Sequence, residues 1–209
     1  MNKTRLSVGI INLDINNIFS VYRAFLKAGF KTEIISFKKK KLNYDIVILP
    51  GVGAFKSGMK FLKETHFTDQ LYNYLETPNS LIYGICLGMQ LLFNKSYEFV
   101  ETKGLGLIDG SVVKFPNNKA NITHLGWNKL NIKEKNFKED FKKFENKYFY
   151  FAHSYYAKPR LKNDIFSSSR YGAINFCSAI KRGNIFGTQF HPEKSGLKGL
   201  EILNNFKNL

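Results

Sequence analysis

Cys86 stands between two glycines in the segment Gly84-Ile85-Cys86-Leu87-Gly88, where one apolar run ends and another begins. Glycines two positions before and two after a nucleophile relieve crowding at a strand-to-helix turn, which exposes the nucleophile above the sheet edge. A thiol at a helix N-terminus is also favoured as the thiolate. The pattern predicts a nucleophile elbow followed by a helix over residues 89–93. A buried structural cysteine between packing glycines would give the same five residues.

A nucleophilic cysteine needs a base and a group that orients the base. His191 follows the apolar segment 185–190, so we expect it at the end of a strand. Glu193, two positions on, can then accept the imidazole N–H. Of the other histidines, His66 is expected on a surface helix, while His124 and His153 flank expected site loops without a nearby carboxylate. We therefore predict a catalytic triad of Cys86, His191 and Glu193, with His191 as general acid and base.

A third segment that could do chemistry is Pro50-Gly51-Val52-Gly53-Ala54-Phe55, directly after the apolar run 46–49. A Gly-x-Gly loop at a strand end can turn backbone N–H groups toward the oxygen of a tetrahedral intermediate. Standing by itself, the segment would be an ordinary turn. Beside the elbow, it predicts an oxyanion hole in which the N–H of Leu87 is the second donor.

The elements that must position these residues follow from the periodicity of the apolar side chains. The expected strands are residues 6–11, 32–37, 46–49, 81–85, 111–115, 148–152, 172–180 and 184–190. A helix begins at Ile18 and stops at Gly29, and another begins near Gly196. Strands that alternate with helices predict an α/β fold with a mixed, mainly parallel open sheet, and the triad then lies at strand C-terminal ends. The step Gly183-Asn184 indicates a hairpin.

The chain is expected to form one domain over residues 1–209, with the polar stretch 131–147 as a variable surface insertion. Hydrophobic residues make up 44% of the sequence, and no N-terminal apolar stretch reaches signal-peptide or transmembrane length, so a soluble cytoplasmic protein is expected. The net charge of +16 would suit nucleic-acid binding. However, 27 of the 32 basic residues are Lys, and they are scattered over the chain, which argues against it. The run 38–41 reads as a solvated loop after a strand.

Nearly the whole chain resembles the class I glutamine amidotransferases, and within them the glutaminase subunit of imidazole glycerol phosphate synthase (HisH-like). The elbow, extended to Gln90, and His191-Pro192-Glu193 match the superfamily. The narrower resemblance rests on four further segments: residues 50–55, 124–128, 148–156 and 189–200. It implies a three-layer sheet flanked by helices with flavodoxin-like topology. Val52 distinguishes this subfamily from other class I members, which usually carry a glycine-richer loop there.

The resemblance implies that the Cys86 thiolate attacks the carboxamide of L-glutamine and that His191 protonates the departing ammonia. Val52, after a peptide reorientation, and Leu87 would form the oxyanion hole. The backbone end of glutamine would be held by Gly53, Gln90, Glu98, Ser154 and Tyr155. Ammonia would pass to a (β/α)8-barrel cyclase in a heterodimer that makes imidazole glycerol phosphate and AICAR in histidine biosynthesis. The partner contact and ammonia path would involve Asn12, Asn17, Trp127 and Lys194. No metal and no cofactor is implied.

One segment departs from the family pattern. Where the family reads Asp-Tyr-Gly-x-Gly-Asn, residues 12–17 read Asn-Leu-Asp-Ile-Asn-Asn, and Asp109 and Thr123 replace usual prolines. The changed loop faces the partner in the family, so the alternative is a paralogue that donates ammonia for amidation of a surface-polysaccharide sugar. A related cysteine hydrolase or chaperone would lack the residue 50–55 loop and the downstream His-x-Glu, and both are present. A catalytically dead protein of this type is disfavoured because no triad residue is missing.

Overall fold

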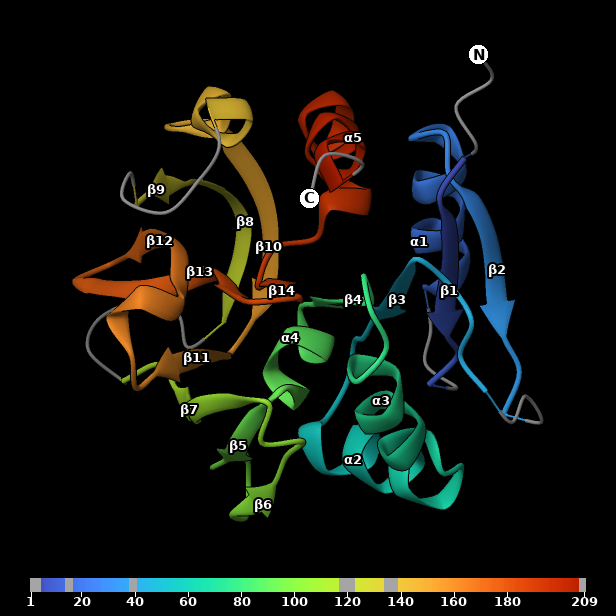
Figure 1. The fold of residues 1–209 in the computed structure, drawn as a ribbon. Coiled ribbons are helices and arrows are strands. Elements are labelled where there is room, and N and C mark those ends of the chain that lie inside the picture. Colours follow the sequence, from blue (N-terminus) through green and yellow to red (C-terminus); the bar gives the residue numbers. More distant parts are fainter. Residues whose placement is uncertain (1–4, 14–16, 38–40, 117–122, 134–138, 207–209) are drawn as a thin grey trace.

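The computed structural model describes residues 5–13, 17–37, 41–116, 123–133 and 139–206 (Figure 1). Its first half alternates strands and helices as the apolar pattern predicts. The elements in order are β1 (Ser7–Ile11), α1 (Ile18–Lys27), β2 (Lys31–Ile35), β3 (Ile46–Leu49), α2 (Phe55–Glu64), α3 (Phe67–Leu75), β4 (Leu81–Ile85) and α4 (Leu87–Leu91). Helix α1 stops before Gly29, whose φ of 86° takes the chain out of the helix.

The second half is mostly antiparallel. Its strands are β5 (Phe93–Ser96), β6 (Thr102–Lys103), β7 (Ile108–Lys114), β8 (His124–Lys129), β9 (Asn131–Ile132), β10 (Tyr148–His153), β11 (Tyr155–Pro159), β12 (Ile165–Tyr171), β13 (Ile174–Arg182) and β14 (Ile185–Thr188). The short helices η2 (Glu139–Phe144) and η3 (Lys162–Asp164) lie between them, and η4 (Pro192–Lys194) and α5 (Gly196–Asn205) follow the last strand. Gly183 and Asn184 form the turn between β13 and β14, as predicted, since Arg182 pairs with Ile185.

The main sheet has eight strands in the order β2-β1-β3-β4-β14-β13-β12-β9. The first five are parallel, and β13, β12 and β9 each pair antiparallel with their neighbour. Strands β4 and β14 are therefore adjacent at the centre although they are far apart in the sequence (Figure 1). This adjacency brings the loops after the two strands together.

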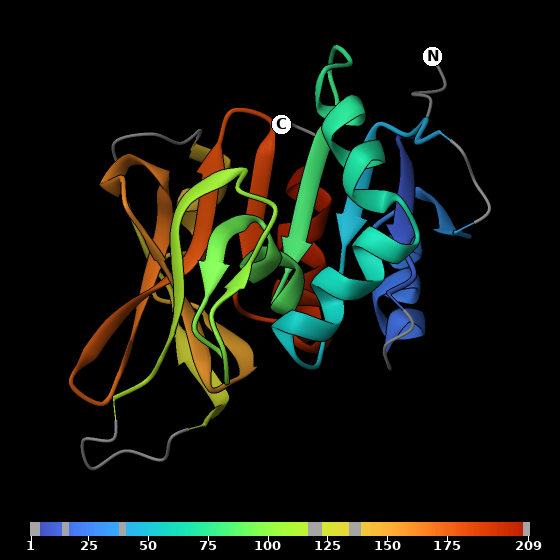
Figure 2. The ribbon, with the colours of Figure 1, turned by 90° about the horizontal axis from the view of Figure 1, so that it is seen from below.

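Alternate residues of the parallel strands enter two separate cores, one on each face of the sheet. Ile48 packs with Val21 of α1 and Leu203 of α5, whereas Leu49 packs with Met59 of α2 and Leu71 of α3. Figure 2 shows the helices on the two faces, which makes the three-layer α/β arrangement that was predicted. A two-stranded sheet, β10-β8, extends the first layer, and a four-stranded sheet, β11-β7-β5-β6, extends the second.

Several sequence-based expectations are corrected. The helix expected over residues 89–93 is Leu87–Leu91, because it begins directly after the elbow, and Phe93 instead opens β5. Gly172 lies in a turn, so its strand begins at Ile174. The elements that were not predicted are β5, β6, β8, β9, β11 and β12 and the helices α2 and α3. The polar stretch 131–147 is not only surface, since Phe141 and Phe144 are buried in the first core. Its residues 134–138 and residues 38–40 of the lysine run lie outside the described residues.

Candidate functional site

Cys86 occupies the sharp turn between β4 and α4. Its backbone has φ 53° and ψ −106°, a conformation that non-glycine residues rarely adopt and that marks strained functional turns. The backbone N–H of Cys86 donates to the carbonyl oxygen of Thr188 at 2.7 Å, and the Cys86 carbonyl accepts from the N–H of Gln90 at 3.2 Å. These two bonds fix the turn between the last residue of β14 and the first turn of α4. The predicted nucleophile elbow has this geometry.

The elbow glycines are required by close backbone contacts. A Cβ atom built on Gly88 would lie 1.7 Å from the carbonyl oxygen of Leu49, and one built on Gly84 would lie 2.6 Å from the backbone nitrogen of Met89. Any larger residue at either position would push the helix away from the strand ends. The two glycines therefore let α4 start close against the sheet, as the sequence pattern predicted.

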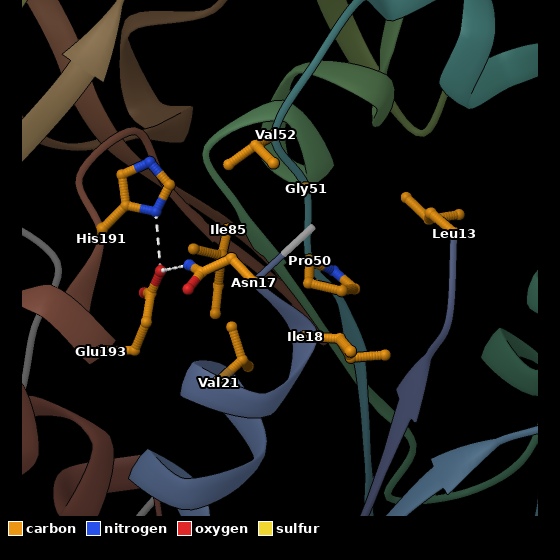
Figure 3. Close-up of a pocket in the computed structure, with 10 residues that line it drawn as sticks. All are labelled: Leu13, Asn17, Ile18, Val21, Pro50, Gly51, Val52, Ile85, His191 and Glu193. Atoms are coloured by element: carbon orange, nitrogen blue, oxygen red, sulfur yellow. Dashed lines mark hydrogen bonds and ion pairs between the residues drawn. The ribbon is translucent and has the colours of Figure 1, made fainter. Parts of the chain in front are cut away.

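His191 follows β14 and projects toward Glu193, which lies in the short helix η4. Nδ1 of His191 and Oε1 of Glu193 are 2.8 Å apart, and their side chains are 2% and 1% exposed. Because a carboxylate can only accept, Nδ1 carries the proton and donates it. Asn17, at the start of α1, donates from Nδ2 to the same oxygen at 3.1 Å. Figure 3 shows both contacts converging on one carboxylate.

The remaining ring nitrogen of His191, Nε2, is buried and makes no hydrogen bond of normal geometry within the described part of the chain. Burial by itself lowers the pKa of His191, but the charge and hydrogen bonding of Cys86, followed by those of Glu193, raise it to about 10. The protonated form of the ring is thus favoured by Cys86 and by Glu193. This arrangement can supply a nucleophile and a proton donor in the same place.

A second polar contact reaches the cysteine from Gln189, which sequence reasoning did not single out. Nε2 of Gln189 donates to Sγ of Cys86 at 3.6 Å, and its Oε1 accepts from Nε2 of Gln90 at 3.0 Å. Gln90 also donates from Nε2 to the carbonyl oxygen of Tyr155 at 2.8 Å. The only sequence signal for Gln189 was its place in the segment that resembles the family, two positions before His191.

All five residues predicted to hold glutamine line one cavity of about 370 Å³ that opens beside Cys86. Its lining is Val52, Gly53, Cys86, Leu87, Gln90, Glu98, Phe99, Thr123, Ala152, His153, Ser154 and Tyr155. The carboxylate of Glu98 accepts from the backbone N–H of Phe55 at 2.5 Å, so it also caps the N-terminus of α2. The hydroxyl of Ser154 lies 2.8 Å from that of Thr123.

The two predicted oxyanion donors are not both turned to the cavity in this structure. The N–H of Leu87 donates to the carbonyl oxygen of Gly51 at 3.4 Å, across the gap between the two loops. The peptide that carries this carbonyl also carries the N–H of Val52. Gly53, the next residue, has φ 112°, which favours glycine.

The four residues predicted for the partner contact divide into separate groups. Trp127 is 55% exposed and packs edge-on against Tyr150, with ring centres 6.0 Å apart. Nζ of Lys194 lies 5.9 Å from the centre of the same ring. The side chain of Asn17 reaches Glu193, and the half-buried Asn12 follows β1. Tyr150, which the sequence analysis missed, thus joins Trp127 and Lys194 into one exposed aromatic and basic cluster.

This Trp127–Tyr150–Lys194 cluster is connected to His191 through the backbone. The N–H of His191 donates to the carbonyl oxygen of Tyr150 at 2.9 Å. The hydroxyl of Ser195 accepts from the N–H of Tyr150 at 3.0 Å and donates to the carbonyl oxygen of His191 at 2.6 Å. A displacement of the Tyr150 backbone would therefore shift the backbone of His191, the predicted base.

His124 and His153 form a buried pair at the first residue of β8 and the last residue of β10, where each flanks a loop as expected. Nδ1 of His124 and Nε2 of His153 are 3.1 Å apart, and Nδ1 of His153 lies 2.8 Å from the carbonyl oxygen of Tyr155. Burial lowers the pKa of His124 to about 4 and that of His153 to about 3. Both rings are neutral at pH 7, and His153 connects the pair to the cavity wall.

Among the described residues, no helix combines the length and the apolar character needed to cross a bilayer. The same residues hold no group of three or more His, Cys, Asp or Glu side chains arranged to bind a metal ion.

The family model for class I glutamine amidotransferases matches residues 10–208, nearly the whole of the chain. The chain therefore belongs to the class I glutamine amidotransferase family. This result agrees with the elbow, the adjacent histidine and the cavity, and it makes the protein an enzyme of that class.

Within the class, the chain is similar to curated imidazole glycerol phosphate synthase subunits HisH. The chain is 41% identical to that subunit from Wolinella succinogenes over 95% of this chain and 98% of the relative. It is 42% identical to the one from Carboxydothermus hydrogenoformans, with 96% and 98% covered. At this identity and coverage the chain is a member of the HisH group.

Solved structures agree on the fold. PurLQS from Thermotoga maritima superimposes with a TM-score of 0.78 at 20% identity and covers 98% of this chain and 99% of that one. A crystal structure of a glutamine amidotransferase superimposes with a TM-score of 0.70 at 16% identity, over 95% of this chain and 97% of the other. The predicted fold class is confirmed.

Proposed function

We propose that this protein hydrolyses L-glutamine to glutamate with a triad of Cys86, His191 and Glu193 and passes the ammonia to a synthase partner. The observation that carries the proposal is the state of His191. Its Nδ1 is held by Glu193 at 2.8 Å. Its Nε2 is buried and makes no hydrogen bond of normal geometry with the described residues, and a looser contact with Cys86 helps to raise the pKa of the ring. A buried nitrogen without a well-formed hydrogen bond is costly unless it serves a reacting group.

In the proposed reaction the Cys86 thiolate adds to the carboxamide carbon of glutamine and forms a tetrahedral intermediate. The imidazolium of His191 donates its Nε2 proton to the amide nitrogen, and the C–N bond breaks to release ammonia. The neutral ring then removes a proton from water, which attacks the glutamyl thioester and frees glutamate. Glu193 holds the ring orientation in both steps.

The oxyanion hole requires one local change. Rotation of the Gly51–Val52 peptide would remove the Gly51 carbonyl from the N–H of Leu87 and bring the N–H of Val52 toward the same place. One movement would then supply both donors for the developing oxyanion. The positive φ of Gly53 supports this, because glycine can absorb the change in backbone angles.

Glutamine would occupy the cavity beside Cys86. Both N–H groups of Gln90 are directed at protein acceptors, Tyr155 and Gln189, so Gln90 offers a ligand its oxygen, which suits the α-ammonium group. Gly53, Ser154 and Tyr155 surround the same space. The carboxylate of Glu98 accepts a hydrogen bond from the N–H of Phe55. Glu98 would therefore both hold the start of α2 in place and contact the backbone end of glutamine.

The proposed partner is a (β/α)8-barrel cyclase that uses the ammonia to make imidazole glycerol phosphate and AICAR in histidine biosynthesis. The partner would cover the Trp127–Tyr150–Lys194 cluster, whose aromatic and cationic side chains suit an interface. A small cavity of about 10 Å³ lies against His191 and Glu193 and is lined by Leu13, Ile18, Val21 and Ile85 among others (Figure 3). This largely apolar space beside His191 and Glu193 would give ammonia an exit toward Asn17.

The test is to mix the purified chain with each barrel cyclase encoded in the same genome and to measure glutamate formation. We expect strong stimulation by the histidine-pathway cyclase together with its ligand and no glutamate release by Cys86→Ala in the same complex. Stimulation only by a cyclase encoded beside sugar-modifying genes would favour the surface-polysaccharide alternative. Undiminished glutamate release by Cys86→Ala would exclude the proposed chemistry.

A further inference from the structure

Gln189 directly follows β14, two residues before His191, and its side chain is completely buried. It lies between two residues to which the proposed function already gives roles, Cys86 and Gln90. Its backbone N–H donates to the carbonyl oxygen of Ser178 at 2.8 Å, which anchors it to β13. A polar side chain enclosed so fully must have its hydrogen-bonding groups satisfied, and its partners define how its amide is oriented.

The orientation of the Gln189 side-chain amide follows from which of its neighbours can donate a hydrogen bond. Nε2 of Gln90 can only donate, so the atom of Gln189 that receives it at 3.0 Å is the oxygen Oε1. The other end of the same amide, Nε2, must then point to Sγ of Cys86, 3.6 Å away. Gln90 is itself fixed by its bond to the carbonyl oxygen of Tyr155. A directed series of N–H donors therefore runs from the glutamine cavity to the sulfur.

The sulfur of Cys86 also has a neighbour that can accept a hydrogen bond but cannot donate one. The carbonyl oxygen of Ala152 lies 3.8 Å from Sγ of Cys86 and can only accept a hydrogen bond. This contact suits the neutral thiol, which has a proton to donate. The N–H of Gln189 suits the thiolate, because a donor stabilises negative charge on sulfur. The relative strength of the two contacts therefore affects how much of Cys86 is present as the reactive thiolate.

We propose that Gln189 is a positioning residue for the nucleophile: its amide holds the Cys86 thiolate in place and couples it to Gln90 in the substrate cavity. The assignment rests on the proposed glutaminase function for its consequences in turnover. The effect of Gln189 on the Cys86 thiol is independent of that function, because it can be measured without glutamine.

The first experiment measures alkylation of Cys86 by iodoacetamide in the full-length chain, with the modified residue located by mass spectrometry. Gln189→Met keeps the size of the side chain and removes both hydrogen bonds. Gln189→Glu keeps an acceptor for Gln90 but removes the donor to sulfur. We expect both variants to react about tenfold more slowly than the wild type at pH 7 and at an equal rate near pH 10, where the thiolate forms without help.

Gln70→Met is the matched control, because Gln70 is a half-buried glutamine on α3 that lines a different pocket. It should react like the wild type, and thermal unfolding should show that all variants remain folded. A merely structural Gln189 would change stability without changing the pH dependence of alkylation. Rates at pH 7 within twofold of the wild type in both folded Gln189 variants would overturn the proposal.

The second experiment measures glutamate release in the complex with the cyclase. Gln189→Glu should lower kcat about tenfold with little change in KM, because Gln90 keeps its acceptor, whereas Gln189→Met should change both. If the wild-type complex releases no glutamate while the alkylation rates differ as expected, the proposed function fails and the role of Gln189 stands. If turnover is normal and alkylation is unaffected in the variants, only the role of Gln189 fails.

Discussion

Nδ2 of Asn17 donates to Oε1 of Glu193 at 3.1 Å across a separation of 176 residues. The same oxygen lies 2.8 Å from Nδ1 of His191, so Asn17, the residue directly before α1, helps to hold the carboxylate that orients the predicted base. Asn17 has φ 86°, a left-handed conformation that asparagine tolerates better than most residues. From the sequence, Asn17 is expected at the partner contact or the ammonia path, and the structure adds a contact between its side chain and Glu193.

Asn17→Ala should lower glutaminase kcat in the complex by about fivefold to tenfold, because Glu193 loses one of the two donors that fix its carboxylate. The measurement is the rate of glutamate formation at saturating glutamine. Ser20→Ala, one turn further along the exposed side of α1, is the control and should behave as the wild type. An unchanged kcat in Asn17→Ala would show that Glu193 is held well enough by its other contacts.

The protonation of His191 should depend on Cys86. The pKa of His191 is raised to about 10, and Cys86 contributes more to the increase than Glu193 does. Because the folded-state pKa lies above the unfolded value of about 6.5, the associated stability is fully present below pH 6.5 and is lost as pH rises toward 10. Cys86→Ala should therefore move the NMR titration midpoint of His191 to lower pH. A midpoint identical in both proteins would contradict the thiolate–imidazolium pair.

The His124–His153 pair should make the protein sensitive to acid. The pKa values of both residues are lowered, mainly by burial, to about 4 and about 3. The unfolded chain therefore binds more protons than the native state below pH 6.5, and stability falls as pH drops. Between pH 7 and pH 5 each histidine should cost up to about 2 kcal/mol of the free energy of unfolding.

Urea unfolding at the two pH values measures this cost. His153→Gln should lose roughly half of the pH dependence, while its stability at pH 7 is lower because the bond to Tyr155 is changed. A wild-type protein equally stable at pH 5 and pH 7 would mean that the rings accept protons without unfolding.

Gly88→Ala should destabilise the fold by more than about 3 kcal/mol, because the added Cβ would lie 1.7 Å from the carbonyl oxygen of Leu49. Gly183→Ala is the matched control. Its Cβ would meet no atom within 4 Å, so it should cost only about 1 kcal/mol for the φ of 54°. Urea unfolding of both variants gives the comparison, and equal losses would argue against the close approach of α4 to β3.

Trp127→Ala should weaken binding of the cyclase about tenfold, because an exposed tryptophan packed on Tyr150 is the type of residue that dominates interfaces. Calorimetric titration of the cyclase into the chain measures the change. Leu161→Ala serves as the control, since Leu161 is 48% exposed and lies between β11 and η3. Wild-type affinity in Trp127→Ala would place the partner on another surface.

Local chemistry determined much of this protein from the sequence. The turn at Cys86 and its glycines were predictable because a nucleophile at a strand-to-helix turn leaves a local pattern of residue types, although the Leu49 carbonyl that requires Gly88 lies far away in the sequence. The pairing of His191 with Glu193 was predictable for the same reason, since two positions at a strand end suffice to bring them together. The periodicity of the apolar side chains likewise indicated the parallel strands and the helices that begin at Ile18 and near Gly196, whereas the three-layer arrangement was implied by the family resemblance.

Only the tertiary structure decided which distant residues meet the predicted triad. The adjacency of β4 and β14 places Gln189 beside Cys86, and the packing of α1 against the sheet places Asn17 on Glu193. Phe141 and Phe144 are buried although they lie in a stretch whose composition suggested surface. Such contacts depend on strand order and on long-range packing, which a local pattern of residue types does not encode. The sequence alone predicted a nucleophile, its base and the orienting acid, and the fold decided what surrounds and connects them.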